Sequence, residues 1–182
     1  MSFNAVLSRL ARRFAGDLRG VSAVEFALVL PLMITLYLGG VEVSQAITAS
    51  RKATLVSRTV TDLASQVASI SNASMNDILN ASSAIISPFA PADLKVTVSC
   101  VTIDANGKAT IAWSDTLNGT ARAVGSGVTL PSALNVANTS LIWSEVQYDY
   151  KPTIGYVITG TLSLKDQMYM RPRLSDTVTR TS

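Results

Sequence analysis

The chain has 182 residues, a formal net charge of +3, no histidine and a single cysteine. Charged residues make up only 15% of it, which is low for a soluble domain. Without histidine, the commonest general base and the commonest metal ligand are both missing, and one cysteine cannot form an intramolecular disulfide. The charge excess lies at the N-terminal end and the rest is formally neutral, so a nucleic-acid-binding surface is not expected.

Residues 1–20 are predicted to form a basic cytoplasmic leader, because they hold four arginines and one aspartate (Arg9, Arg12, Arg13, Arg19 and Asp17). Residues 21–41 follow as a transmembrane helix: at ~1.5 Å per residue they would rise about 31 Å, which matches a hydrocarbon core of roughly 30 Å. The arginines before this span predict a cytoplasmic N-terminus and a C-terminal domain in the periplasm, with the span in a bacterial inner membrane. A removable secretory signal is less favoured, since its apolar core is usually about 7–15 residues long.

Residues 42–70 are predicted to continue the span as a stalk helix, giving one helix of about fifty residues. Small or apolar residues recur there at alternating spacings of three and four, which is a heptad-like helical period. The members of this seam are Ala46, Ala49, Ala53, Val56, Val60, Leu63, Val67 and Ile70. The seam either packs on the chain's own domain or, especially at its alanine end, contacts a partner helix.

Residues 71–182 are predicted to form a small α+β domain. A short helix is expected from a capping box of Ser74 and Asp77 to Pro88. The period then changes from 3.6 to 2, with Asn106-Gly107 marking a hairpin turn. Strands are expected over residues 94–103, 109–113, 141–152 and 161–170. The fold class is therefore α+β, a long N-terminal transmembrane-plus-stalk helix packed on a small antiparallel sheet, with one further short helix.

No catalytic, cofactor or metal site is expected. A serine or threonine nucleophile would lack a histidine base, and no Cys/His cluster could hold a metal. Glu145 and Asp149 fall on the polar face of a strand and are interpreted as solvated surface, while Cys100 falls on an apolar face and is interpreted as a small core residue. A periplasmic hydrolase with a signal anchor is disfavoured for the same lack of histidine.

The stretch "RGVSAVEFALVLPLMITLYLGGVEV" places an acid, Glu25, near the start of the span. An acid at the centre of a span would cost about 2.5–3.5 kcal/mol on insertion scales, less near the edge, and such residues usually have a partner. The dipole of a helix favours an anion near its N-terminus, which makes Glu25 tolerable there but does not explain why an acid is present. If the chain is cut after Gly20, Val21 gains a free amine that is largely cationic near pH 7. Glu25 could then neutralise that amine on a neighbouring helix and fix the stagger between subunits.

These residues resemble a type IV prepilin processing site, with Gly20 before the scissile bond and Glu25 as the fifth residue after it. The longer string "RGVSAVEFALVLPLM" resembles the TadE-like pseudopilins of the bacterial tight-adherence (Flp, type IVc) pilus system. The segments "EVQYDYKP" and "MYMRPR" also resemble later strands of that family.

The resemblance implies a membrane-anchored minor pseudopilin that takes part in assembly or priming of a tad-type pilus, and that is no enzyme. Its implied partners are a prepilin peptidase, which would cut between Gly20 and Val21, and other tad pilins and pseudopilins, which Glu25 and Phe26 would contact after cleavage. No cofactor, nucleic acid or small-molecule substrate is implied. It could lie in the membrane or in or at the tip of an extracellular pilus. An uncleaved single-span scaffold of an envelope or secretion complex is the alternative, and a TadF-like protein would share the N-terminal features.

Overall fold

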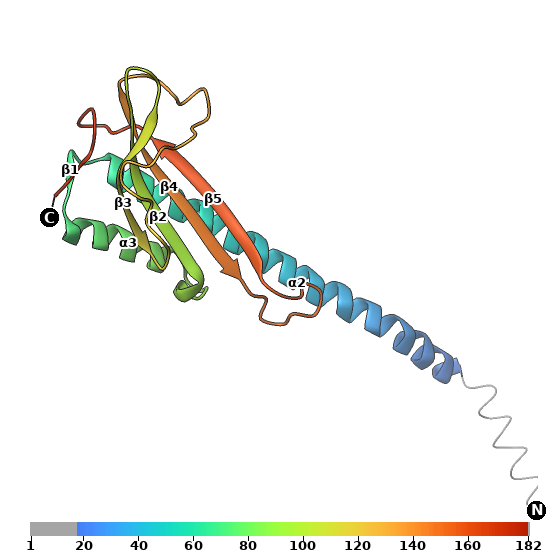
Figure 1. Cartoon of the computed structure of the whole chain (residues 1–182). Coiled ribbons are helices and arrows are strands. Elements are labelled where there is room, and N and C mark those ends of the chain that lie inside the picture. The colour runs from blue at the N-terminus through green and yellow to red at the C-terminus, as the bar shows by residue number, and fades with distance from the viewer. Residues whose placement is uncertain (1–17, 182) are drawn as a thin grey trace, which may run out of the picture.

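The computed structural model describes residues 18–181. The leader arginines Arg9, Arg12 and Arg13 therefore lie outside the described residues. The chain folds into a long helix that carries a small α+β domain on its C-terminal half (Figure 1). The expected α+β fold class is confirmed.

Helix α2, Leu18–Ser65, is 48 residues long and includes Pro31. Its first part projects beyond the domain, and its second part lies along the sheet (Figure 1). The helix ends five residues before the predicted end of the stalk, and the chain then turns into the short strand β1, Ser69–Ile70. The peptide oxygen of Ser65 accepts a hydrogen bond from the backbone of Arg173 at 2.9 Å, so a C-terminal segment satisfies this end of the helix.

The sheet has four antiparallel strands in the order β3-β2-β4-β5. Their bounds are β2 Leu94–Ile103, β3 Ala109–Leu117, β4 Thr139–Tyr150 and β5 Leu162–Met170. The predicted β2–β3 hairpin is confirmed, and Gly107 adopts a φ of 78° in its turn, a conformation that favours glycine. Asp104 stabilises the turn by accepting backbone hydrogen bonds from Asn106 and Lys108 at 2.8 and 2.9 Å.

The main core lies between α2 and the sheet, because alternate residues of β2 and β4 point toward the helix. Its centre consists of side chains at most 2% exposed: Val56, Val60, Val96, Val98, Ile142 and Val146. Helix α3, Asn72–Ile86, adds Met75, Leu79 and Ile86 to the same core. A smaller apolar cluster on the opposite face of the sheet, which includes Trp143, is covered by the loop of residues 118–138.

Two features of the domain differ from the sequence predictions. The N-cap of α3 is Ser71, whose side chain accepts from the Ser74 backbone, so the capping box at Ser74 and Asp77 was wrong by three residues. The short strand β6, Thr179–Arg180, which was not predicted, pairs in parallel with β1. The indole of Trp113 donates to the oxygen of Val178 at 2.7 Å, which ties this C-terminal segment to the core. The short 3₁₀ helix η1, Pro91–Asp93, leads into β2.

A buried polar contact joins the helix to the sheet. The hydroxyls of Ser57 and Ser144 lie 2.9 Å apart, and Thr61 donates to the Ser144 hydroxyl at 2.6 Å. All three residues are fully buried. Since buried hydroxyls need partners, this contact fixes where α2 sits along β4.

Ser144→Ala is expected to lower the free energy of unfolding by about 1–3 kcal/mol, because it leaves the buried Ser57 hydroxyl without its side-chain partner. Denaturant unfolding of the detergent-solubilised chain, followed by tryptophan fluorescence, measures this. Ser50→Ala is the control, since Ser50 is exposed on the same helix, and we expect it to change stability by less than about 0.5 kcal/mol. Equal effects of the two substitutions would contradict the proposed contribution of the buried contact.

Candidate functional site

The projecting part of α2 is exposed at every position from Gly20 to Ile34. Large apolar side chains lie on all of its faces: Val21, Val24, Phe26, Leu28, Val29, Leu30, Leu32, Met33 and Ile34. The helix is long and apolar enough to cross a membrane. A helix that is apolar on all faces is suited to a membrane or to the core of an assembly, and not to water.

The predicted processing and contact residues lie together on this projecting part. Gly20 lies in the helix, and a Cβ placed on it would meet nothing within 4 Å. Val21 is 54% exposed and Phe26 59% exposed, so neither is used in the domain's own core. Glu25 is exposed as well, and none of the ion pairs that the structure gives among the side chains of residues 20–181 includes it.

The structure places the seam residues in three groups. Ala46, Ala49, Ala53, Val56 and Val60 are buried on the sheet-facing side of α2. Leu63 is 36% exposed, and Ala64 is buried in its stead. A 3–4 repeat has a period of 3.5, so it drifts by about 20° per heptad against a helix of 3.6 residues per turn. Val67 and Ile70 lie beyond the end of the helix, where Ile70 joins the core from β1.

A second acid on α2, Glu42, has the opposite environment to Glu25, and sequence reasoning missed it. Glu42 is 1% exposed. Its carboxylate accepts backbone hydrogen bonds from Tyr156 at 2.6 Å, Val157 at 2.9 Å and Ile158 at 2.7 Å. These donors belong to the β4–β5 loop, residues 151–161, and they satisfy the buried charge. The sequence feature that could have drawn attention to Glu42 is its position directly after the charge-free run of residues 26–41.

The acids of the sheet's polar face are paired with cations. Arg122 contacts Glu145 through two hydrogen bonds of 2.6 and 2.7 Å, and its guanidinium lies 4.1 Å from the centre of the Trp143 ring. Lys95 contacts Asp149 at 2.9 Å and lowers the pKa of that carboxyl to about 2, with help from Gln147. These contacts explain both acids as ion-paired surface residues of the sheet.

The Lys95–Asp149 pair is expected to make stability depend on pH below about 4. The pKa of Asp149 is about 2 in the folded chain and about 3.9 in an unfolded one. Its contribution is therefore complete above the unfolded value and is lost as the pH falls toward 2. The contribution is no more than about 1 kcal/mol, because solvent screens an exposed pair. Asp149→Asn and Lys95→Met should each lower stability at pH 7, and the deficit of Asp149→Asn should vanish near pH 2. A deficit independent of pH would contradict this assignment.

Within residues 18–181, no group of three or more His, Cys, Asp or Glu side chains could hold a metal ion. Cys100 is fully buried, and burial raises the pKa of its thiol. The thiol packs in the core beside Thr177.

In the part of the chain that the structure describes, one apolar helix long enough to cross a membrane projects from a small α+β domain. A family model described as TadE-like protein matches residues 20–62. The expected resemblance to TadE-like proteins of the tight-adherence system is thereby confirmed for this helix. The strands that contain "EVQYDYKP" and "MYMRPR" lie outside the match, and their resemblance stays a prediction. No curated protein and no solved structure matches the chain.

Proposed function

We propose that this chain is a membrane-anchored minor pseudopilin, processed after Gly20, that takes part in assembly or priming of a tad-type pilus. In this role residues 1–20 are a cytoplasmic leader that is removed, and residues 21–41 span the inner membrane. The rest of α2 is the stalk, which carries the domain in the periplasm. The chain is the substrate of a prepilin peptidase and is not itself an enzyme.

The contrast between the two acids of α2 carries this proposal. Glu42 is buried and receives three backbone hydrogen bonds from its own chain. Glu25 is exposed on the apolar projecting part, with no ion-pair partner among residues 20–181, whose side chains the structure describes. An acid in a span is costly without a partner, so the partner of Glu25 belongs to another molecule.

A new α-amine at Val21 supplies a partner of the right charge. Cleavage after Gly20 creates it four residues before Glu25, so two processed helices can pair the amine of one with the carboxylate of the other. Phe26 lies beside this pair and adds apolar contact area. Because the pair forms only after cleavage, processing and assembly are coupled.

Intact mass with N-terminal sequencing tests the proposal on membrane-extracted protein from cells with and without a prepilin peptidase. We expect mature chain starting at Val21 only in cells with the peptidase. A chain that keeps Met1–Gly20 in both strains would exclude the pseudopilin role and favour a single-span scaffold. A start near residue 50 would indicate an ordinary signal peptide and a periplasmic domain without an anchor.

A further inference from the structure

The β4–β5 loop, residues 151–161, presents apolar side chains beside the helix. Ile154, Tyr156 and Val157 are 49%, 57% and 48% exposed. No charged residue occurs from Pro152 to Leu164. A run of exposed apolar side chains without charge marks an interaction surface.

Contacts with α2 fix the height of this loop along the helix. The Tyr156 hydroxyl lies 3.5 Å from the Thr35 hydroxyl. Two helical turns further along α2, Glu42 accepts hydrogen bonds from the backbone of the loop. At Gly39, an added Cβ would lie 3.1 Å from Val157, so glycine permits this close approach. Figure 1 shows the loop lying against α2 at the end of the domain nearest the projecting helix.

The projecting part of α2, which lies free of the domain, is too short by itself to cross a bilayer, so the β4–β5 loop beside the next residues of α2 must enter the bilayer as well. Residues 21–34 rise about 21 Å at ~1.5 Å per residue, whereas the hydrocarbon core is roughly 30 Å thick. The missing ~9 Å corresponds to residues 35–40, and the loop lies beside these residues.

Sliding the helix toward the cytoplasm does not remove the mismatch. In the processed chain nothing precedes Val21, and in the unprocessed chain Arg19 would enter the hydrocarbon. A shorter apolar segment thins the bilayer or draws flanking residues into it. The uncharged flanking residues are those of the β4–β5 loop.

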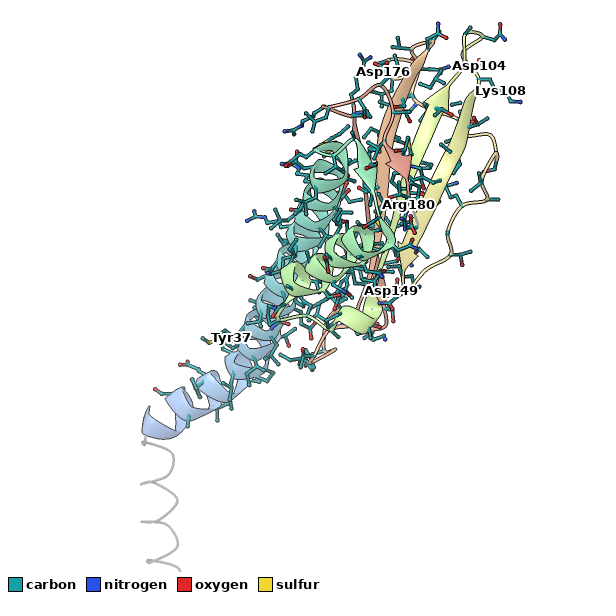
Figure 2. The ribbon with its side chains drawn as sticks, turned by 90° about the vertical axis from the view of Figure 1, so that its left-hand side faces the viewer. Tyr37, Asp104, Lys108, Asp149, Asp176 and Arg180 are labelled. Carbon is teal, nitrogen blue, oxygen red and sulfur yellow. The ribbon has the colours of Figure 1, made fainter. Side chains whose placement is uncertain are left out.

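We propose that the β4–β5 loop is a membrane-docking element that inserts into the lipid of the outer leaflet. Ile154, Tyr156 and Val157 enter the acyl region, where the Tyr156 hydroxyl keeps the Thr35 hydroxyl 3.5 Å away as a polar neighbour. Tyr37 is 72% exposed on α2 at a similar level and contacts the same lipid layer. In Figure 2, Tyr37 and Asp149 lie toward the membrane end of the molecule, and Asp104, Lys108 and Asp176 lie at the far end. The span and the β4–β5 loop together hold the domain at a fixed orientation to the membrane. This inference rests on the proposed membrane anchoring.

Depth measurement on the reconstituted chain tests the inference. The processed protein is placed in vesicles of phosphatidylcholine with a minority of phosphatidylglycerol, and an NBD fluorophore is attached at Ile154→Cys or, as a second site, Thr153→Cys. Both residues are exposed, so these changes leave the core intact. Leu30→Cys reports on the span, and Val124→Cys, which is 71% exposed on another loop, reports on water. The unsubstituted protein is the labelling blank, because Cys100 is buried.

We expect lipid carrying a doxyl group on the upper acyl chain to quench the label at Ile154, lipid carrying it near the end of the chain to quench the label at Leu30, and iodide to quench only the label at Val124. Lipid quenching at Leu30 with iodide quenching at Ile154 would overturn the inference and leave the anchored role standing. Iodide quenching at Leu30 would instead contradict the membrane anchor itself. A label at Ile154 that neither agent quenches would show that protein, such as a second copy, covers the loop, and this too overturns the inference.

Discussion

Glu25→Ala is expected to leave the chain cut after Gly20 but to reduce its amount in the assembled pilus fraction by about tenfold or more, because a hydrogen-bonded charge is worth about 1.5–3 kcal/mol. The substitution removes a charge from the apolar span, so it favours membrane insertion. A loss of assembly therefore cannot be explained by failed insertion. Immunoblots of the sheared pilus fraction and the membrane fraction, with intact mass of the membrane form, measure both steps.

Gly20→Val is the companion variant and should fail at the earlier step, the cleavage itself. A side chain at the scissile bond should block cleavage, so the leader stays and no amine forms at Val21. Because a Cβ at Gly20 meets nothing within 4 Å, the fold is not disturbed. Gly40→Ala is the matched control, since a Cβ there is equally unobstructed, and it should be cut and assembled as usual. Wild-type assembly of Glu25→Ala, or cleavage of Gly20→Val, would contradict the proposed coupling.

Local patterns were sufficient to predict the sheet and most of the long helix. The alternation in residues 94–103 follows from burial of one face of β2, and Asn106-Gly107 predicts the hairpin because the turn needs a positive φ. The seam followed the buried face of α2 as far as Val60. The seam then failed at Leu63. Its spacing has a period of 3.5 residues, whereas an α-helix has 3.6 residues per turn, so the seam gradually leaves the buried face.

Contacts between distant parts of the chain could not be predicted in the same way. The β1–β6 pair joins two-residue strands from opposite ends of the domain, each too short to show a period. The partners of Glu42 are backbone N–H groups 114 to 116 residues away, and a backbone donor has no identity in the sequence. Glu25 differs for a related reason: its proposed partner exists only after cleavage and on another chain, so no single folded chain contains it.

Glu42→Gln is expected to release the β4–β5 loop from the helix. The two carboxylate oxygens accept three backbone hydrogen bonds, with Tyr156 on one oxygen and Val157 and Ile158 on the other. Glutamine has the same shape, but its NH₂ group cannot accept, so at least one of these N–H groups loses its acceptor. A buried donor without an acceptor is costly enough to raise local opening by about tenfold or more. Amide hydrogen exchange at residues 156–158 should therefore accelerate by that factor.

Two comparisons make the result specific to the loop. Exchange in β2 and β4 should stay slow, because the core between α2 and the sheet does not depend on Glu42. Glu25→Gln is the same chemical change on the same helix, at an exposed position, and should leave residues 156–158 protected. Unchanged protection in Glu42→Gln would show that Gly39–Val157 packing alone holds the loop. Faster exchange throughout the domain would show instead that Glu42 stabilises the whole fold, in which case the loop is not an independently held element at the membrane surface.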